Sequence, residues 1–394
     1  MIKKFCIIVD GYSSEYRIVN VFVENLVNQF QDFGVDCCVI APQPISKYLI
    51  TKTRFSKCKY LRETTGGNHV VVYAPKWFSF SAKKLLLFNT ASLTLCAYRR
   101  CVEKTFKKMW KHYNGFDAVY GHFIFPAGIV ATELGRAYNI PSFFAYGENG
   151  EYSINYLGEK KTRKLLNNIT GVVSVSSLNK RVLIERKIVE QSKIEVFPNS
   201  IDGKLFCPKN KQELRKQRKI SDNCFVVAFV GRFLDVKGVL RLDKALSELD
   251  DENVYAIFVG EGPQEPTYNR TLYCGKVDHK ELPNYLALAD VFVLPTIAEG
   301  CCNAIVEALG CGLPVISSNE EFNDDILDDS CSIRIDSLSI EEIKGAILEL
   351  KNDSHKRKEM SKNAVLKARA LNIEKRAMNI LSFIEKKRDE YYGK

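Results

Sequence analysis

The sequence predicts an α/β protein of two domains, each a doubly wound parallel sheet, facing each other across a cleft. Three observations lead to this expectation. Apolar runs typical of buried strands alternate with stretches of helical periodicity. A segment rich in charged and turn-forming residues interrupts the alternation at 198–222. The length of 394 residues exceeds one ordinary core and suits two domains.

The first domain is expected to span residues 1–200. Apolar side chains at positions 22, 23, 26, 27 and 30 recur at helical spacing, and Gly34 ends that helix. The strands of this domain are predicted at 5–9, 35–41, 69–73, 118–121, 142–146 and 171–175.

The second domain is expected to span residues 201–371. The amphipathic tail 372–394 is predicted to be a helix that packs back on the first domain. In such sheets ligands bind beyond the carboxyl ends of the strands. The strands of the second domain are predicted at 225–231, 254–259, 290–294 and 314–317, with a helix at 282–288.

Composition excludes several classes of protein. Apolar residues make up 46% and charged residues 26%, as in globular proteins. No run of 18 apolar residues occurs, and the first apolar run, 5–9, is too short for a signal peptide. The 13 cysteines lack metal-ligand spacing, so we expect reduced thiols in the cytoplasm, with no structural zinc and no other cofactor.

The net charge of +10 is unevenly distributed. Residues 1–200 hold 28 Lys and Arg against 15 Asp and Glu, whereas the remainder holds 29 against 32. An anionic partner is therefore expected to meet the first half. No RNA-binding signature accompanies the charge, and no nucleic-acid partner is expected.

The most informative stretch runs from Pro295 to Ile316. A strand is expected to end at Pro295, and a loop carrying Glu299 and Gly300 follows. We expect Asn303 to cap the next helix, with Glu307 in its first turn. The free N–H groups around Cys302 and the positive helix end would suit a diphosphate.

This stretch resembles the signature of glycosyltransferase family 4, in which two glutamates are separated by seven residues. The resemblance implies a GT-B fold with two Rossmann-like domains. It also implies that Glu299 contacts the donor sugar and Glu307 the ribose hydroxyls. Gly300, Cys301, Cys302 and Asn303 are then donor-binding residues. The alternative is two surface acids at a strand–helix junction.

A second motif, Val230 to Gly238, places Arg232 and Lys237 after a strand and before a helix. The family resemblance implies that this pair grips the diphosphate. Fixed cations would stabilise the charge that grows on the leaving nucleoside diphosphate, which makes both residues catalytic candidates. An ordinary basic loop is the alternative. Because no D-x-D motif occurs, we expect activity without a metal ion.

The loop Cys274–His279 resembles the family's nucleobase loop, and Val277 is predicted to line the donor there. Such contacts are largely made by the backbone, so the sequence leaves the base open between UDP- and GDP-sugars. Plain turns are the alternative. The family's usual Asn-Gly pair is replaced by Asn199-Ser200, and this change is expected to affect only a linker turn.

In the first half, His122 ends a predicted strand at the point where the family carries a histidine near the reacting carbon. The family retains the anomeric configuration, and its usual mechanism lets the departing phosphate accept the acceptor's proton. His122 would then orient the sugar rather than act as a general base. A structural histidine is the alternative.

The loop after the first strand departs from the family, because it carries only Gly11 where relatives have two adjacent glycines. Gly11 is still predicted to contact the donor. The resemblance also points to acceptor-side residues. They are Tyr12, Tyr16, Arg17 and, after a later strand, Glu148.

Residues 76–111 combine basic and apolar side chains and contain one acid, Glu103. Two interpretations remain open: a surface for an anionic bilayer, or a helix pair packed on the sheet with solvated lysines. The basic residues are Lys76, Lys83, Lys84, Arg99, Arg100, Lys104, Lys107, Lys108 and Lys111. The apolar ones are Trp77, Phe78, Phe80, Leu85, Leu86, Leu87, Phe88, Phe106 and Trp110.

These features favour a retaining glycosyltransferase that uses a nucleotide-sugar donor and a saccharide or lipid-linked acceptor in cell-surface polysaccharide synthesis. We expect it in the cytoplasm, at the inner face of the membrane if the basic segment binds lipid. Two alternatives stay open: another GT-B nucleotide-sugar enzyme resembling an epimerase, and a non-catalytic binder of nucleotide sugars or polyanions.

Overall fold

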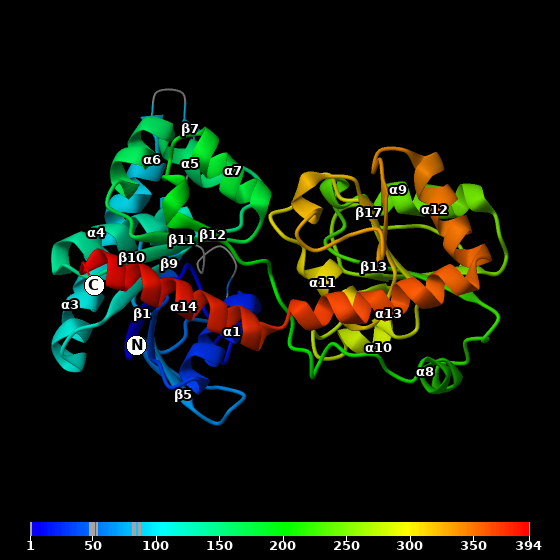
Figure 1. The fold of residues 1–394 in the computed structure, drawn as a ribbon, viewed down its shortest axis with the longest axis horizontal. Helices are drawn as coiled ribbons and strands as arrows, with labels where there is room; N and C mark the ends of the chain where they lie inside the picture. The colour runs from blue at the N-terminus through cyan, green and yellow to red at the C-terminus, as the bar shows by residue number, and fades with distance from the viewer. Residues whose placement is uncertain (1, 47–51, 53, 81–83, 86–87, 394) are drawn as a thin grey trace. The chain divides into compact units, whose positions relative to one another are not determined.

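Two parallel sheets organise the chain, one in each of two separately folded units. The computed structural model describes residues 2–46, 52, 54–80, 84, 85 and 88–393. The first unit comprises Met1–Phe197 and Glu374–Lys394, and the second comprises Pro198–Ile373. Both chain termini belong to the first unit (Figure 1).

The first unit is built on an eight-stranded sheet in the order β12-β11-β10-β9-β1-β2-β5-β4. Neighbouring strands are parallel, except that β4 pairs antiparallel with β5. The strands of this sheet are β1 (Lys4–Ile8), β2 (Asp36–Ile40), β4 (Lys59–Glu63), β5 (His69–Tyr73), β9 (Ala118–His122), β10 (Ser142–Tyr146), β11 (Gly171–Ser174) and β12 (Ile194–Val196).

All six strands expected in this half are present in the eight-stranded sheet, which also contains β4 and β12. β4 has no apolar run because exposed and half-buried residues alternate along it at the sheet edge. β12 is only three residues long. Smaller elements form two short pairs, namely β3 (Gln43–Pro44) with β6 (Lys76–Trp77), and β7 (Lys84–Leu85) with β8 (Phe88–Asn89).

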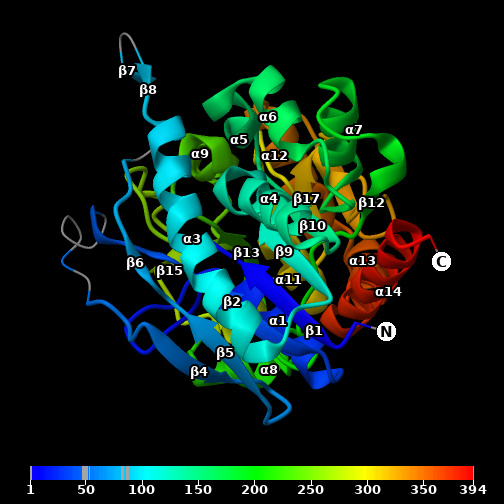
Figure 2. The same ribbon diagram turned by 90° about the vertical axis from the view of Figure 1, so that its left-hand side faces the viewer.

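Helices cover both faces of this sheet. The longest, α3 (Ala91–Tyr113), lies across one face (Figure 2). Its buried side chains include Leu95, Tyr98, Val102 and Phe106, spaced three or four residues apart as an amphipathic helix requires. The others are α1 (Val21–Asp32), α4 (Ile129–Tyr138), α5 (Tyr152–Leu157), α6 (Glu159–Leu166), α7 (Ser177–Glu185) and α14 (Ile373–Tyr391), with short turns η1 (Ile124–Gly128) and η2 (Gln191–Lys193).

A helix pair, one of the two interpretations left open for residues 76–111, is not found in the described part of that segment. There the short strands β6, β7 and β8 precede one helix, α3. The C-terminal helix α14 packs on the first unit, where the Phe383 ring lies 6.3 Å from that of Phe143 and 5.7 Å from that of Phe197. None of the helices in the described residues is long and apolar enough to span a bilayer.

The second unit contains a six-stranded, fully parallel sheet in the order β15-β14-β13-β16-β17-β18. Its strands are β13 (Phe225–Val230), β14 (Val254–Val259), β15 (Thr271–Gly275), β16 (Val291–Leu294), β17 (Val315–Ser318) and β18 (Ser332–Ile335). Its helices are α8 (Lys211–Gln217), α9 (Val239–Leu249), α10 (Leu282–Leu286), α11 (Asn303–Gly310), α12 (Ile340–Asn352) and α13 (Ser354–Ala370), with turns η3 (Asp235–Lys237) and η4 (Glu321–Asn323).

In each sheet the order of the parallel strands reverses once. In the first unit the reversal lies between β1 and β9, and in the second it lies between β13 and β16. Open α/β sheets bind ligands beyond the carboxyl ends of the strands at this reversal. His122 is the last residue of β9, and the loops that follow β1, β13 and β16 carry Gly11, Arg232 and Glu299. These candidate residues therefore lie where the topology favours a site.

Candidate active site

In the second unit, the loops that follow β13 and β16 are joined. The Ile297 N–H donates to the Val236 carbonyl over 2.9 Å, and the Thr296 hydroxyl donates to the same oxygen over 3.0 Å. Gly238 has a φ of 75°, and an added Cβ there would lie 2.3 Å from the Pro295 carbonyl oxygen. Only glycine fits both constraints. The two sequence motifs therefore form one continuous surface.

Lys237 and Glu299, assigned separately from the sequence, form an ion pair with each other. Their side chains are 19% and 9% exposed, so both are largely shielded from water. The Thr296 hydroxyl lies 3.4 Å from the same Glu299 oxygen. The structure thus fixes the lysine and the glutamate at one point of the sheet edge.

Arg232 follows Gly231 directly after β13 and is exposed. It makes no ion pair with any residue that the structure describes. Its guanidinium has five N–H donors that are suited to phosphate oxygens. Arg232 and Lys237 therefore differ: Lys237 is paired and shielded, whereas the Arg232 charge faces solvent.

The start of α11 differs from the expectation at two positions. Cys302, not Asn303, is the N-cap, with extended backbone angles and no side-chain cap hydrogen bond. Asn303 is the first helical residue, and its buried Oδ1 has no partner within the described residues. Glu307 is the fifth helical residue, so it lies beyond the first turn in which it was expected.

The first turn of α11 leaves backbone donors unpaired. Within the described part of the chain, the N–H groups of Asn303 and Ala304 have no backbone acceptor, whereas the Ile305 N–H bonds the Cys302 sulfur. The first N–H groups of any helix lack an intrahelical partner and carry the positive end of the helix dipole. Free N–H groups therefore lie at this helix start, and anion binding there stays a prediction.

Glu307 contacts a residue to which the sequence assigned no role. The His279 Nε2 lies 2.8 Å from Glu307 Oε1, and this hydrogen bond raises the pKa of His279 above its usual range. The His279 ring lies 5.2 Å from the Phe206 ring. This contact brings the loop of partly buried Val277, just beyond β15, against α11.

The loop Gly300–Cys302 is buried, and Asn199, a residue distant in sequence, contacts it. The Asn199 side-chain amide donates to the Cys301 carbonyl over 2.9 Å, and the Asn199 N–H lies 3.3 Å from the Cys301 sulfur. Asn199 was expected only in a linker turn, because its contact partner Cys301 is distant in the chain. Burial raises the pKa of Cys302 well above its usual value, so this thiol stays neutral beside Glu299.

In the first unit, His122 is the last residue of β9 and is 6% exposed. Its ring lies 5.3 Å from the Phe22 ring and 4.6 Å from the Phe123 ring. Burial, followed by the positive charge of Arg376, lowers the pKa of His122 to about 3. Nδ1 has no partner in the described residues. This imidazole is neutral near pH 7 and is a weak base.

The loop after β1 brings three predicted residues together. Gly11, Tyr12 and Arg17 line one narrow pocket with residues that include Tyr60. Tyr12 is 4% exposed, and its hydroxyl has no partner within the described residues. Tyr16 is 45% exposed and is not among the residues that line this pocket.

Glu148 contacts its own loop. Its carboxylate accepts hydrogen bonds from the Ser153 hydroxyl and, over 3.0 Å, from the Ser153 N–H. Burial raises the pKa of Glu148. These bonds fasten the residues after β10 to α5, so the structure gives Glu148 a local structural role.

Metal-ligating side chains do not gather in the described residues: no three His, Cys, Asp or Glu side chains are placed to hold an ion together. At the joined loops of the second unit, Arg232 and Lys237 supply positive side chains, and the start of α11 adds the positive end of a helix dipole.

Comparison with known proteins agrees with the motifs. The profile "Glycosyltransferase Family 4" matches residues 19–204, and "Glycosyl transferases group 1" matches residues 210–367. TuaC of Bacillus subtilis, assigned as a glycosyltransferase of teichuronic acid biosynthesis, is 26% identical over 76% of each chain. An Escherichia coli UDP-Gal:alpha-D-GlcNAc-diphosphoundecaprenol alpha-1,3-galactosyltransferase is 32% identical over 39% of this chain and 44% of its own.

Solved structures show the same fold. Sucrose-phosphate synthase of Thermosynechococcus elongatus superposes with a TM-score of 0.75 at 18% identity, covering 98% of both chains. HepE of Anabaena, in complex with UDP, superposes with a TM-score of 0.72 at 17% identity, covering 98% of this chain and all of that one. The chain belongs to glycosyltransferase family 4 and has the GT-B fold.

Proposed function

We propose that this glycosyltransferase takes a sugar from a nucleoside diphosphate and transfers it, with retention of configuration, to a saccharide or lipid-linked acceptor in cell-surface polysaccharide synthesis. The main support for this proposal is the contact between the loops that follow β13 and β16 in the second unit. There Lys237 pairs with Glu299, Arg232 lies on the same loop as Lys237, and α11 begins shortly after Glu299, all at the strand reversal.

The chemistry of the leaving group supports a nucleotide-sugar donor. Negative charge grows on the diphosphate as its bond to the sugar breaks, and fixed cations stabilise that charge more in the transition state than in the ground state. Arg232 and Lys237 supply cations, and α11 supplies unpaired N–H groups. HepE is described in complex with UDP and with UDP-glucose, and the Escherichia coli relative is named for a UDP-sugar.

The neutral state of His122 supports a sugar-orienting role rather than proton abstraction. In the proposed step the acceptor oxygen bonds to the anomeric carbon on the face that the diphosphate leaves. The acceptor proton passes to the departing diphosphate oxygen. An imidazole with a pKa of about 3 adds no positive charge to the oxocarbenium-like transition state.

The acceptor proposal rests on relatives and on surface charge. TuaC is assigned to teichuronic acid synthesis, and the galactosyltransferase name specifies a diphosphoundecaprenol-linked substrate. Phe78 and Phe80 are 61% and 51% exposed. Lys83, Leu86 and Leu87 of this segment lie outside the described residues, as do the side chains of Lys84, Leu85 and Phe88. The exposed basic residues of α3 are Arg100, Lys104, Lys107, Lys108 and Lys111.

Flotation with liposomes tests the membrane component. We expect the protein to float with anionic vesicles at low salt and not with zwitterionic ones, because basic residues contribute about 1 kcal/mol each near anionic headgroups. Absence of binding to anionic vesicles would reject a peripheral membrane location at the cytoplasmic face.

A donor screen tests the function itself. Thermal shifts against UDP-, GDP- and ADP-sugars should identify one nucleotide class, and NMR of the product should show a retained anomeric configuration. Turnover should persist in EDTA, since the proposal uses no metal ion. Loss of turnover in EDTA with rescue by Mg²⁺ or Mn²⁺ would overturn metal independence. Absence of binding by every nucleotide sugar would overturn the function.

A further inference from the structure

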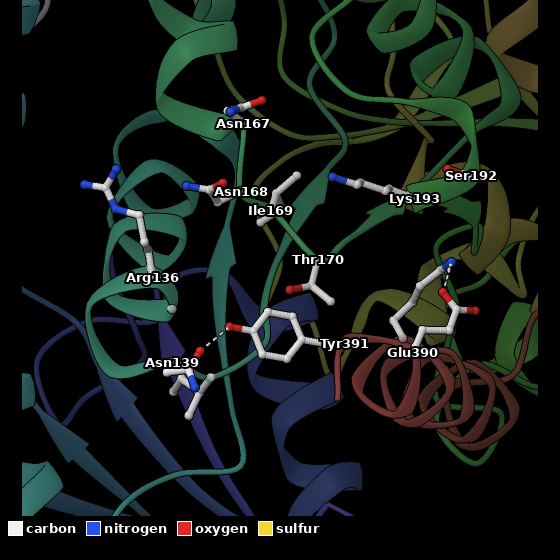
Figure 3. A pocket seen from close by; sticks show the side chains of 13 residues that line it. Arg136, Asn139, Asn167, Asn168, Ile169, Thr170, Ser192, Lys193, Glu390 and Tyr391 are labelled. Carbon is white, nitrogen blue, oxygen red and sulfur yellow. Dashed lines mark hydrogen bonds and ion pairs between the residues drawn. The ribbon is translucent and has the colours of Figure 1, made fainter. Parts of the chain in front are cut away.

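A separate pocket of about 580 Å³ lies in the first unit, on the edge of the sheet opposite His122. Its walls are the loops that precede β10, β11 and β12, together with the end of α14 (Figure 3). His122 instead ends β9, which runs parallel to β10. The volume falls within the range of about 300–1,000 Å³ typical of small-molecule sites.

The pocket carries a surplus of positive charge. Lys387 has a side chain only 12% exposed and pairs with Glu390 over 2.7 Å. Arg136 and Lys193 also line the pocket, and neither has an ion-pair partner among the described residues. Charge neutralisation inside the pocket is therefore incomplete, which favours an anionic ligand.

The remaining lining combines hydroxyl and amide groups with one aromatic ring. Tyr391 is 39% exposed, and its hydroxyl donates to Asn139 Oδ1 over 3.0 Å, which fixes the ring beside the pocket (Figure 3). Amides and hydroxyls complement sugar hydroxyl groups, and an exposed ring offers a face for a pyranose. The neutral polar residues are Asn139, Asn167, Asn168, Thr170 and Ser192.

We propose that this pocket binds an acidic oligosaccharide, in which carboxylate or phosphate groups meet Arg136 and Lys193 while hydroxyls meet the asparagines. A site here would retain an anionic glycan away from the strand ends that carry His122. This inference goes beyond the proposed function, because it concerns glycan binding at a separate pocket. That binding can be measured without the sugar donor and without turnover.

Calorimetry with two matched probes tests the site. The acidic probe is a hexamer of α-1,4-linked galacturonate, and the neutral probe is maltohexaose, which has the same length and linkage type. The test variant Arg136→Ala/Lys193→Ala is compared with Lys358→Ala/Arg369→Ala, which removes two exposed charges from the second unit. Inorganic phosphate is titrated as a third probe, and melting temperatures confirm folding.

We expect the acidic hexamer to bind more tightly than maltohexaose. The pocket variant should weaken it about tenfold, equivalent to about 1.4 kcal/mol, while the control pair stays near wild type. Equal losses of affinity for the acidic hexamer in the two variants would mean that only net charge matters, and would overturn the proposal. The proposal would also be overturned if phosphate bound as tightly as the hexamer, or if the hexamer did not bind. Nucleotide-sugar binding should be unchanged in the pocket variant, so failure here differs from failure of the proposed function.

Discussion

The carboxyl edges of the two sheets are built from opposite kinds of chemistry. In the second unit the candidate groups are charged or hydrogen-bonded to a charge: Lys237 pairs with Glu299, His279 contacts Glu307, and the Arg232 charge faces solvent. In the first unit His122 and Tyr12 are buried and neutral, and each keeps a polar atom without a partner in the described residues. The contrast fits our proposal that one edge holds the charged diphosphate and the other orients the uncharged sugar.

The largest effect should come from removing the charges of the second unit. We expect Arg232→Ala or Lys237→Ala to lower kcat/KM on the order of 10²-fold, about 2.7 kcal/mol of lost transition-state stabilisation. Steady-state kinetics measure this loss. Lys358→Ala, an exposed lysine of the same unit, serves as the control. Near wild-type turnover in both test variants would contradict a catalytic role for the charges of the second unit.

The neutral side predicts a pH-dependent stability. His122 has a pKa of about 3 when folded and about 6.5 when unfolded. Between these two pH values the unfolded chain therefore binds a proton that the folded chain does not bind. Stability from this group is therefore present above about pH 6.5 and is lost as pH falls, by about 2 kcal/mol near pH 5.

Denaturant unfolding at several pH values measures this loss, with His122→Gln as the matched variant that cannot titrate. The variant should lose less stability than wild type between about pH 7 and pH 5. If the free energy of unfolding fell equally with pH in the two proteins, His122 would take up a proton when folded. The first unit's site would then not be neutral, contrary to our comparison of the two units.

Glu299→Gln separates sugar handling from nucleotide binding. It keeps the shape of the side chain but removes the charge paired with Lys237. We expect kcat/KM to fall about tenfold more than affinity for the free nucleoside diphosphate, equivalent to about 1.4 kcal/mol. Isothermal titration with the diphosphate, beside the kinetics, checks this. Equal losses would place Glu299 at the nucleotide instead.

The smallest effect concerns the support of the charged edge. Asn199→Ala removes the hydrogen bond to the Cys301 carbonyl, worth about 1 kcal/mol, and should raise KM for the donor about fivefold. Ser200→Ala, next in sequence and without a partner for its buried hydroxyl in the described residues, should leave KM unchanged. Similar KM values for the two variants would deny Asn199 a positioning role.

Much of the fold followed from local pattern. The predicted strands of both halves are present in the structure. They could be recognised because parallel strands that are buried on both faces consist of continuous apolar runs. The missed strand β4 lies at an edge with both faces partly exposed, so it lacks that signal. The cap of α11 was misplaced because Asn303 is a better intrinsic cap than Cys302, and the tertiary structure overrides that preference.

The site could be predicted only in part, because spacing indicates which residues share a loop but not what they contact. The motifs located Lys237 and Glu299, yet their mutual pairing follows from the adjacency of β13 and β16. The contact of Asn199 with Cys301 joins residues distant in sequence, and no local pattern encodes it. Likewise, the low pKa of His122 follows from burial, which only the packed structure shows.

The central claim is that the second unit grips a pyrophosphate with side-chain cations and the start of α11. Its most direct test compares, by titration calorimetry, the affinities of the preferred nucleoside diphosphate and its monophosphate for wild type and for Arg232→Ala/Lys237→Ala. We expect wild type to prefer the diphosphate and the double variant to lose this preference while still binding the monophosphate. An undiminished preference in the double variant would contradict it.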